Sequence, residues 1–239
     1  YDATTTFGIG AANFSVSGAL DSDVVTLAAS SANFASANVG SGQTVSVSGM
    51  SIASAANGGV TVYGYSAPSG TVTTNTGSIT QRSLSISGSQ IIDKTYDGTA
   101  TASITAGTAS GLQNGETLTI TGSGNYASVN VGSDINVPVT YSLADGTGAA
   151  SNYSLAGETL TGSINPRVLS ISGSSAADKV YDGNNVASLS AGTLSNLVSG
   201  ETLSVAVTGA FASANAAVGI NVPVNYSLRD GSGLAANYS

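Results

Sequence analysis

The sequence predicts an all-β chain of tandem immunoglobulin-like β-sandwich domains in an extended array. Three observations predict it: a long internal repeat, apolar residues that alternate with polar ones, and the lack of an amphipathic helical stripe. Several short apolar runs in each repeat are flanked by Gly, Asn and Asp, which is typical of strands joined by turns. Many short strands in a unit of this length favour two packed sheets.

The repeat has a spacing of 85 residues. Residues 178–183 (DKVYDG) restate residues 93–98 (DKTYDG), and 181 − 96 = 85. This length exceeds the roughly 20 to 50 residues of solenoid repeats and suits a small independent domain. We expect a divergent first repeat at 1–81 that lacks its leading segment, a complete repeat at 82–166, and a third repeat at 167–239 that lacks its trailing segment.

Both ends of the sequence fall inside repeats. We therefore expect an excerpt of a longer polypeptide. Separate chains that polymerise by lending strands to one another would leave the same pattern.

The alternation has the period of two expected of a half-buried strand. In the second repeat its apolar members are Ile135, Val137, Val139, Tyr141 and Leu143; in the third they are Ile220, Val222, Val224, Tyr226 and Leu228. The Ala-rich residues 27–38 are the one tempting helix, and we expect at most a helical turn there.

Composition excludes several classes of function. The 239 residues carry 5 Lys+Arg and 13 Asp+Glu, a formal charge of −8, with no His, Cys or Trp. Five scattered cations are too few for a nucleic-acid interface, so we expect no nucleic-acid partner. No apolar run of about 18 residues is present, so this segment is not expected to insert into a membrane. Without His, Cys, a phosphate loop or zinc ligands, we expect no enzyme, catalytic residue, cofactor or metal.

The ordered motifs of the chain resemble the YDG-type repeat domains of large secreted bacterial adhesins, which include relatives of filamentous haemagglutinin exported by two-partner secretion. The motifs are Asp-Lys-x-Tyr-Asp-Gly, an aromatic residue followed by Ala-Ser-x-Asn-Val-Gly, and Asn-Tyr-Ser. The structural residues that match are Tyr96, Asp97, Gly98, Asn152 and Tyr153 in the second repeat and Tyr181, Asp182, Gly183, Asn237 and Tyr238 in the third. The first repeat departs most, with Ala3 in place of the motif glycine and a looser box at residues 62–66. The resemblance implies an extracellular protein of the bacterial cell surface.

Three motifs allow a chemical and a structural interpretation. Asp97-Gly98 and Asp182-Gly183 suit a turn better than calcium, which needs six to eight oxygens. Lys94 and Lys179 suit a surface pair with a neighbouring aspartate better than a Lys–Asn isopeptide cross-link. The Asn-Tyr-Ser boxes are formal glycosylation acceptors, and we favour a structural role for them.

The expected function is that of structural stalk or fibre repeats of a secreted adhesin, which support cell adhesion or a biofilm matrix. Two alternatives stay open. The repeats could bind a polysaccharide or host glycan multivalently, which predicts exposed aromatic rings at equivalent positions, with Tyr96/Tyr181 and Tyr126/Phe211 as candidates. The chain could also be the subunit of an extracellular filament, with neighbouring copies of itself as partners through strand complementation.

Overall fold

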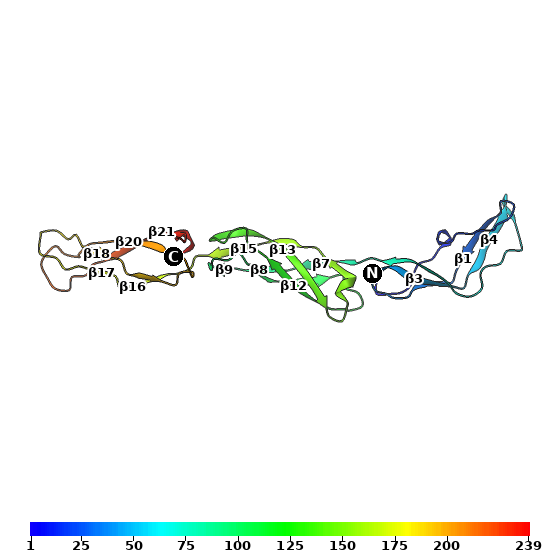
Figure 1. The fold of residues 1–239 in the computed structure, drawn as a ribbon, viewed down its shortest axis with the longest axis horizontal. Coiled ribbons are helices and arrows are strands. Elements are labelled where there is room, and N and C mark those ends of the chain that lie inside the picture. Colours follow the sequence, from blue (N-terminus) through cyan, green and yellow to red (C-terminus); the bar gives the residue numbers. More distant parts are fainter. The chain divides into compact units, whose positions relative to one another are not determined.

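The computed structural model describes all residues, 1–239, and the protein is all-β, as predicted. Its helices are three short 3₁₀ turns, η1 (Ala11–Asn13), η2 (Ala150–Asn152) and η3 (Ala235–Asn237). The strands form several small sheets of two to four strands (Figure 1). No helix is long and apolar enough to cross a bilayer.

The chain divides into two compact units, and the division falls inside the second repeat. Unit 1 comprises residues 1–87, 108–120 and 142–156, and unit 2 comprises residues 88–107, 121–141 and 157–239. Unit 1 therefore holds the first repeat with part of the second, and unit 2 holds the rest of the second with the third.

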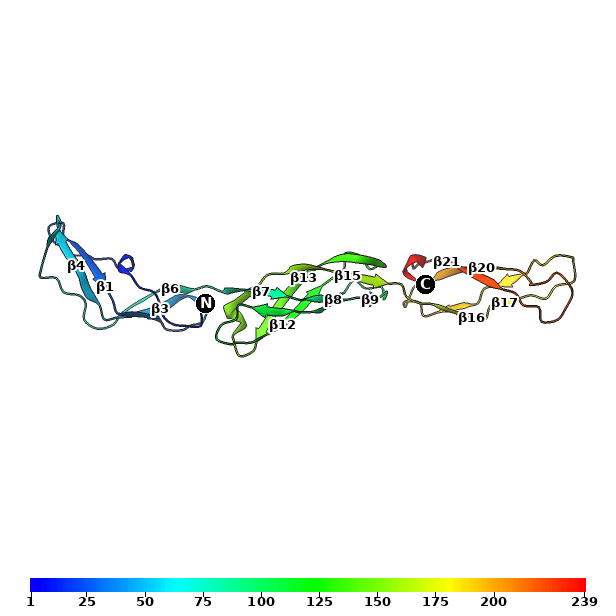
Figure 2. The same cartoon turned by 180° about the vertical axis from the view of Figure 1, so that it is seen from behind.

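The first repeat, in unit 1, contains two three-stranded sheets. Their orders are β1-β4-β5 and β2-β3-β6, and β1 and β4 lie side by side in Figures 1 and 2. The bounds are β1 (Val24–Ala28), β2 (Ser31–Phe34), β3 (Gly40–Ser48), β4 (Ser51–Asn57), β5 (Val60–Thr61) and β6 (Val72–Ile79). Ala32, Val45 and Val47 form its buried core. The Ala-rich residues 27–38 contain β2 and the end of β1 and no helical turn, because their backbone groups pair with β3 and β4.

Unit 1 also contains a sheet of mixed direction from the second repeat, with the order β11-β7-β14. The central strand β7 (Arg82–Ser87) pairs antiparallel with β11 (Thr108–Ser110) and parallel with β14 (Tyr153–Leu155). The parallel pair places the Asn-Tyr-Ser box beside the start of the same repeat.

The four-stranded sheet of the second repeat has the order β12-β13-β15-β9. Its strands are β12 (Leu118–Gly124), β13 (Gly132–Asp145), β15 (Glu158–Asn165) and β9 (Lys94–Thr95); a smaller sheet pairs β8 (Gln90–Ile92) with β10 (Ser103–Thr105). The predicted alternation falls in β13, where Val137 and Val139 are buried and their neighbours are exposed. Ile164 of β15 is only 1% exposed and packs in the same core as Val137.

The third repeat, in unit 2, contains three two-stranded sheets. They pair β16 (Ser170–Ser172) with β19 (Thr193–Ser195), β17 (Ser175–Ala176) with β18 (Leu189–Ser190), and β20 (Leu203–Gly209) with β21 (Val224–Asp230).

One predicted strand is shorter than its alternation suggested. In the third repeat the strand begins at Val224, and Ile220 and Val222 lie outside it. In the second repeat the corresponding part of β13 pairs with β15. In the third repeat β21 pairs with β20 alone, and no strand lies against Ile220 and Val222.

Candidate functional site: the repeat junctions

The motif residues meet in two clusters, which we call the repeat junctions. The second junction lies within unit 2 and joins the second and third repeats. Tyr96 donates a hydrogen bond to Oε1 of Glu201 at 2.6 Å, and Tyr238 donates one to Oε2 of the same carboxylate. The two tyrosine rings pack edge to face, with centroids 5.4 Å apart. Glu201 of the third repeat thus accepts one hydrogen bond from a tyrosine of the second repeat and one from a tyrosine of its own repeat.

The first junction, within unit 1, has the same arrangement. Tyr1 donates to Oε1 of Glu116 at 2.7 Å, and Tyr153 donates to Oε2. The rings of Tyr1 and Tyr153 also pack edge to face, with centroids 5.2 Å apart. Because the surrounding sequences differ, the recurrence identifies these side chains as the common element of the junction.

A buried asparagine forms the second contact of each junction. Asn237 is 2% exposed; its Oδ1 accepts a hydrogen bond from the Val131 backbone N–H at 2.9 Å, and its Nδ2 donates to Oδ1 of Asn130 at 3.0 Å. Asn152, 1% exposed, makes the same bonds to Val39 and Asn38. Since a buried amide without partners is costly, these bonds require the neighbouring repeat to be in place. The Asn-Val-Gly motif of one repeat and the Asn-Tyr-Ser box of the next are therefore two halves of one contact.

Local turns position the junction side chains. Glu201 follows a turn in which its N–H donates to the Val198 carbonyl, and Gly200 has a φ of 86°, which favours glycine. The hydroxyl of Tyr238 accepts a hydrogen bond from the Val198 N–H at 3.1 Å. The 3₁₀ turn η3 precedes Tyr238 and is held by a hydrogen bond from the Ala235 N–H to Asp230.

The Tyr-Asp-Gly motif forms a turn. Asp97 accepts the backbone N–H of Thr99 at 2.9 Å, and Gly98 has a φ of 75°. Asp182 and Gly183 repeat this geometry, with the N–H of Asn184 as the donor. The pKa of Asp182 lies below its ordinary value, first because Lys179 bonds to its carboxylate and then because the Asn184 amide does. Nowhere do three or more His, Cys, Asp or Glu side chains gather in a metal-binding group.

Lys94 lies beside the same turn. Its Nζ is 2.7 Å from Oδ1 of Asp97 and donates to the carbonyl and hydroxyl of Thr99. Lys179 pairs with Asp182 at the same distance and with Asn184. These are the aspartate pairs that the sequence interpretation favoured over a cross-link.

The equivalent YDG tyrosines of the second and third repeats differ in their surroundings. Tyr96 is 3% exposed, whereas Tyr181 is 65% exposed and meets no counterpart of Glu201. In the first repeat, Tyr65 donates to Asp23 at 2.6 Å and accepts the Leu20 N–H, so this pair corresponds to Tyr153 with Glu116. Gly64 stands there in place of the buried asparagine.

Glu116, Glu201 and Tyr1 are junction residues that the sequence interpretation missed. A signal existed for the glutamates, since Gly-Glu-Thr-Leu recurs at residues 115–118 and 200–203, again 85 apart, in a chain with few acids. Such a recurrence marks the residue as part of the repeat, yet nothing local indicates that one of its two tyrosine partners comes from a different repeat.

The junction tyrosines predict a loss of stability in alkali. Burial, followed by the hydrogen bond to Glu201, raises the pKa of Tyr96 to about 12 from an ordinary 10.0. The folded protein keeps a proton that the unfolded chain releases between these values, so this contribution to stability is complete below about pH 10 and is lost as the pH rises towards about 12. We expect the urea midpoint to fall across this range and the Tyr96→Phe variant to have a shallower pH dependence. Equal slopes for the two proteins would contradict this assignment.

The lysine pair predicts a small effect. Asp97 is 46% exposed at its side chain, so solvent screens the pair. We expect Lys94→Gln to lower the free energy of unfolding by less than about 1 kcal/mol. The intact mass of the protein should equal that of its sequence. A mass lower by one ammonia would instead indicate a Lys–Asn cross-link.

The junctions are built for association between repeats. Both carboxylate oxygens of each glutamate accept a hydrogen bond from a tyrosine hydroxyl. The oxygen and the nitrogen of each buried asparagine side chain both form hydrogen bonds with the neighbouring repeat.

A family model described as the YDG domain matches the chain three times, at residues 1–75, 80–161 and 165–239. No curated protein and no solved structure matches the chain. The matches cover nearly the whole sequence and include both halves of the junction contacts. The chain therefore belongs to the YDG domain family.

Proposed function

We propose that the chain consists of structural repeats from the stalk or fibre of a secreted bacterial surface adhesin, which support cell adhesion or a biofilm matrix. The duplicated junction is the observation that carries this proposal. A spacer gains length by repetition and needs each domain to hold its neighbour in a set orientation. The paired phenols on one glutamate and the bridging asparagine are contacts of that kind, and they occur at both junctions.

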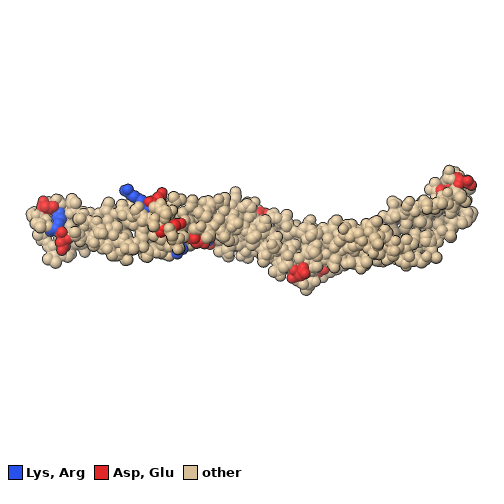
Figure 3. All heavy atoms as spheres, in the orientation of Figure 1, with Lys and Arg blue, Asp and Glu red and all other residues tan.

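The surface composition also supports a structural role. Acidic and basic side chains occupy a small part of the face shown in Figure 3, in keeping with 18 such residues in 239 (13 + 5). A weakly charged surface offers few strong electrostatic contacts to other molecules. Immunoglobulin-like sandwiches in an extended array remain part of the same proposal.

The glycan-binding alternative has less support. It predicts aromatic rings that are exposed at equivalent positions in successive repeats. Tyr96 is 3% exposed and its equivalent Tyr181 is 65% exposed, while Tyr126 is 3% exposed. The exposed rings therefore do not recur.

Small-angle scattering of the full chain would test the stalk function. We expect one well-defined maximum dimension for the natural sequence and a broader distribution for the double variant Glu116→Ala/Glu201→Ala, in which both junctions are weakened. A broad distribution for the natural sequence would contradict a stiff spacer. Saturable binding of the folded chain to a panel of polysaccharides and host glycans would make the array itself the adhesive element.

A further inference from the structure

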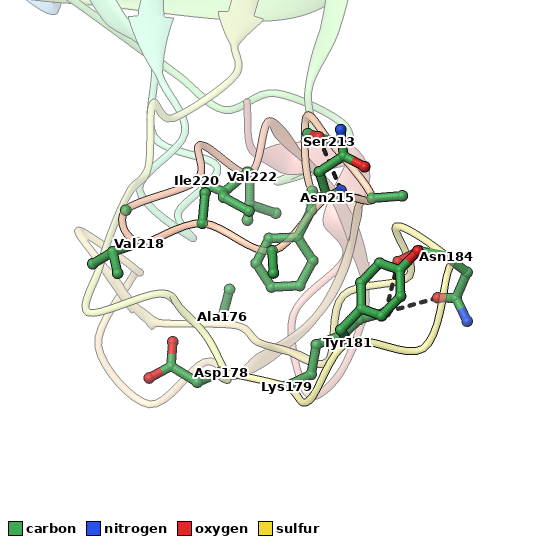
Figure 4. A pocket seen from close by; sticks show the side chains of 15 residues that line it. Ala176, Asp178, Lys179, Tyr181, Asn184, Ser213, Asn215, Val218, Ile220 and Val222 are labelled. Atoms are coloured by element: carbon green, nitrogen blue, oxygen red, sulfur yellow. Dashed lines mark hydrogen bonds between the residues drawn. The ribbon is translucent and has the colours of Figure 1, made fainter.

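The third repeat contains an open pocket of about 330 Å³ within unit 2. Figure 4 shows it between the segment that contains Lys179 and Tyr181 and the segment that contains Ile220 and Val222. Ala176, Phe211, Ile220 and Val222 supply much of its apolar lining. It is the part of the repeat where the predicted strand fails to form.

In the second repeat, strand β15 occupies the corresponding place. Gly162 and Leu160 of β15 face Ile135 and Val137 of β13, and Ile164 is in register with Lys94 of β9. Adding 85 to Ile135, Val137 and Lys94 gives Ile220, Val222 and Lys179, which all line the pocket. The pocket walls therefore correspond to the two strands that flank β15 in the second repeat.

The polar contacts of β15 have counterparts at the pocket as well. Asp93 accepts the backbone N–H of Ser163 at 2.8 Å, and the Tyr96 N–H donates to the Asn165 carbonyl at 2.9 Å. Their equivalents, Asp178 and Tyr181, line the pocket. A strand in the pocket would thus find a carboxylate acceptor and a backbone donor at the same spacing.

The first repeat fills this place in the same way, with β6 against β3. Gly40 pairs with Ile79 there, as Gly132 pairs with Ile164 in the second repeat. The occupying strands share the sequence Thr-Gly-Ser-Ile, at residues 76–79 and 161–164.

The shared glycine lies over an aromatic ring in both repeats. A Cβ at Gly77 would be 2.6 Å from Cε1 of Phe34, and a Cβ at Gly162 would be 2.7 Å from the hydroxyl of Tyr126. The third repeat has Phe211 at this position, and it lines the pocket. The ring therefore requires glycine at one point of any strand that enters.

We propose that the pocket of the third repeat binds an extended β-strand of the Thr-Leu-Thr-Gly-Ser-Ile-Asn type, supplied by a further YDG repeat. The strand pairs antiparallel with residues 220–224 and parallel with residues 179–180, and its isoleucine enters the apolar lining. Strands β6 and β15 are already paired in their own sheets, so neither of them is the donor. The inference rests on strand pairing and does not depend on the stalk function.

A synthetic peptide with the sequence of residues 157–166 (GETLTGSINP) would test the proposal on the full-length protein. We expect saturable binding at one site, measured by the anisotropy of a labelled peptide, and slower hydrogen exchange at the amides of residues 220–224. Aspartate in place of the isoleucine, or valine in place of the second glycine, should weaken binding by at least about tenfold, because a charge would be buried or a Cβ would meet Phe211.

Matched protein variants locate the binding. Val222→Asp, in the pocket, should abolish it, whereas Val60→Asp, at a position 71% exposed in the first repeat, should leave it unchanged. Equal binding by both variants would overturn the proposal. Dimerisation of the protein without peptide, if abolished by Val222→Asp, would also overturn it, since a second copy would then be the occupant.

The same strand can also be tested as a tail joined covalently to Ser239. Binding of the tail is intramolecular, so its effective concentration at the pocket is high even where the free peptide binds weakly. Asn152-Tyr153-Ser154 matches Asn237-Tyr238-Ser239, so the sequence of residues 155–166 added after Ser239 continues in register. We expect this tail to raise the Tm and to protect the amides of residues 220–224. The tail with aspartate for isoleucine should do neither. Equal protection with both tails, or with neither, would overturn the proposal.

Discussion

Replacing Glu201 by alanine is expected to destabilise unit 2 by about 2 to 4 kcal/mol. The change leaves the hydroxyls of Tyr96 and Tyr238 without their acceptor, while both residues stay buried in the core around Val137. A buried donor that loses its partner costs about 1 to 3 kcal/mol. Urea unfolding followed by hydrogen exchange would assign the loss to the amides of unit 2.

Two further variants make this prediction specific. Glu201→Gln keeps a side chain of the same length with one oxygen that can still accept a hydrogen bond, so it should lower the free energy of unfolding less than Glu201→Ala does. Glu116→Ala removes the same contacts from Tyr1 and Tyr153 and should destabilise unit 1 instead. If Glu201→Ala were no worse than a surface substitution, the glutamate would not be what holds the repeats together.

Replacing Ile164 by alanine should cost about 2 to 5 kcal/mol, the usual range for a buried large-to-small substitution. Ile164 is 1% exposed and packs in the cluster that contains Val137 and Tyr126. Truncation would leave a cavity in this core, against the face of the sheet in which β15 pairs with β9. The free energy of unfolding in urea measures the loss.

A matched exposed site serves as the control. Val60→Ala, at a position 71% exposed, should change stability by no more than about 0.5 kcal/mol. A cost for Ile164→Ala close to that of the control would mean that β15 contributes little to its repeat. It would also weaken the inference that a similar strand fills the pocket of the third repeat.

Local patterns account for what could be predicted. The alternation from Ile135 to Leu143 falls in β13 because side chains on a strand alternate between two faces, and only one face of this strand is buried. The Asp97-Gly98 turn is equally local, since the aspartate bonds to an amide two residues away and the glycine supplies the positive φ. Neither feature needs a distant partner.

The parallel strand pairs could not be predicted in this way. β7 pairs with β14 and β15 with β9, and in each case some 70 residues separate the partners (153 − 82 = 71; 164 − 94 = 70). A pattern within one strand shows which face is buried but does not name the neighbouring strand. For the same reason the sequence predicted a strand from Ile220, although only the part from Val224 has a partner.

The sequence by itself determined that this protein is an all-β chain of repeated YDG motifs, because repetition, alternation and turn residues act over a few neighbouring positions. Only the tertiary structure decided what the motifs are for. It brings the tyrosine of one repeat to the glutamate of the next, and it buries Asn152 and Asn237 against backbone more than 100 residues away (152 − 39 = 113; 237 − 131 = 106). The physical reason is that a buried hydrogen-bonding group is satisfied by whichever partner folding brings to it, and such partners leave no periodic trace in the sequence.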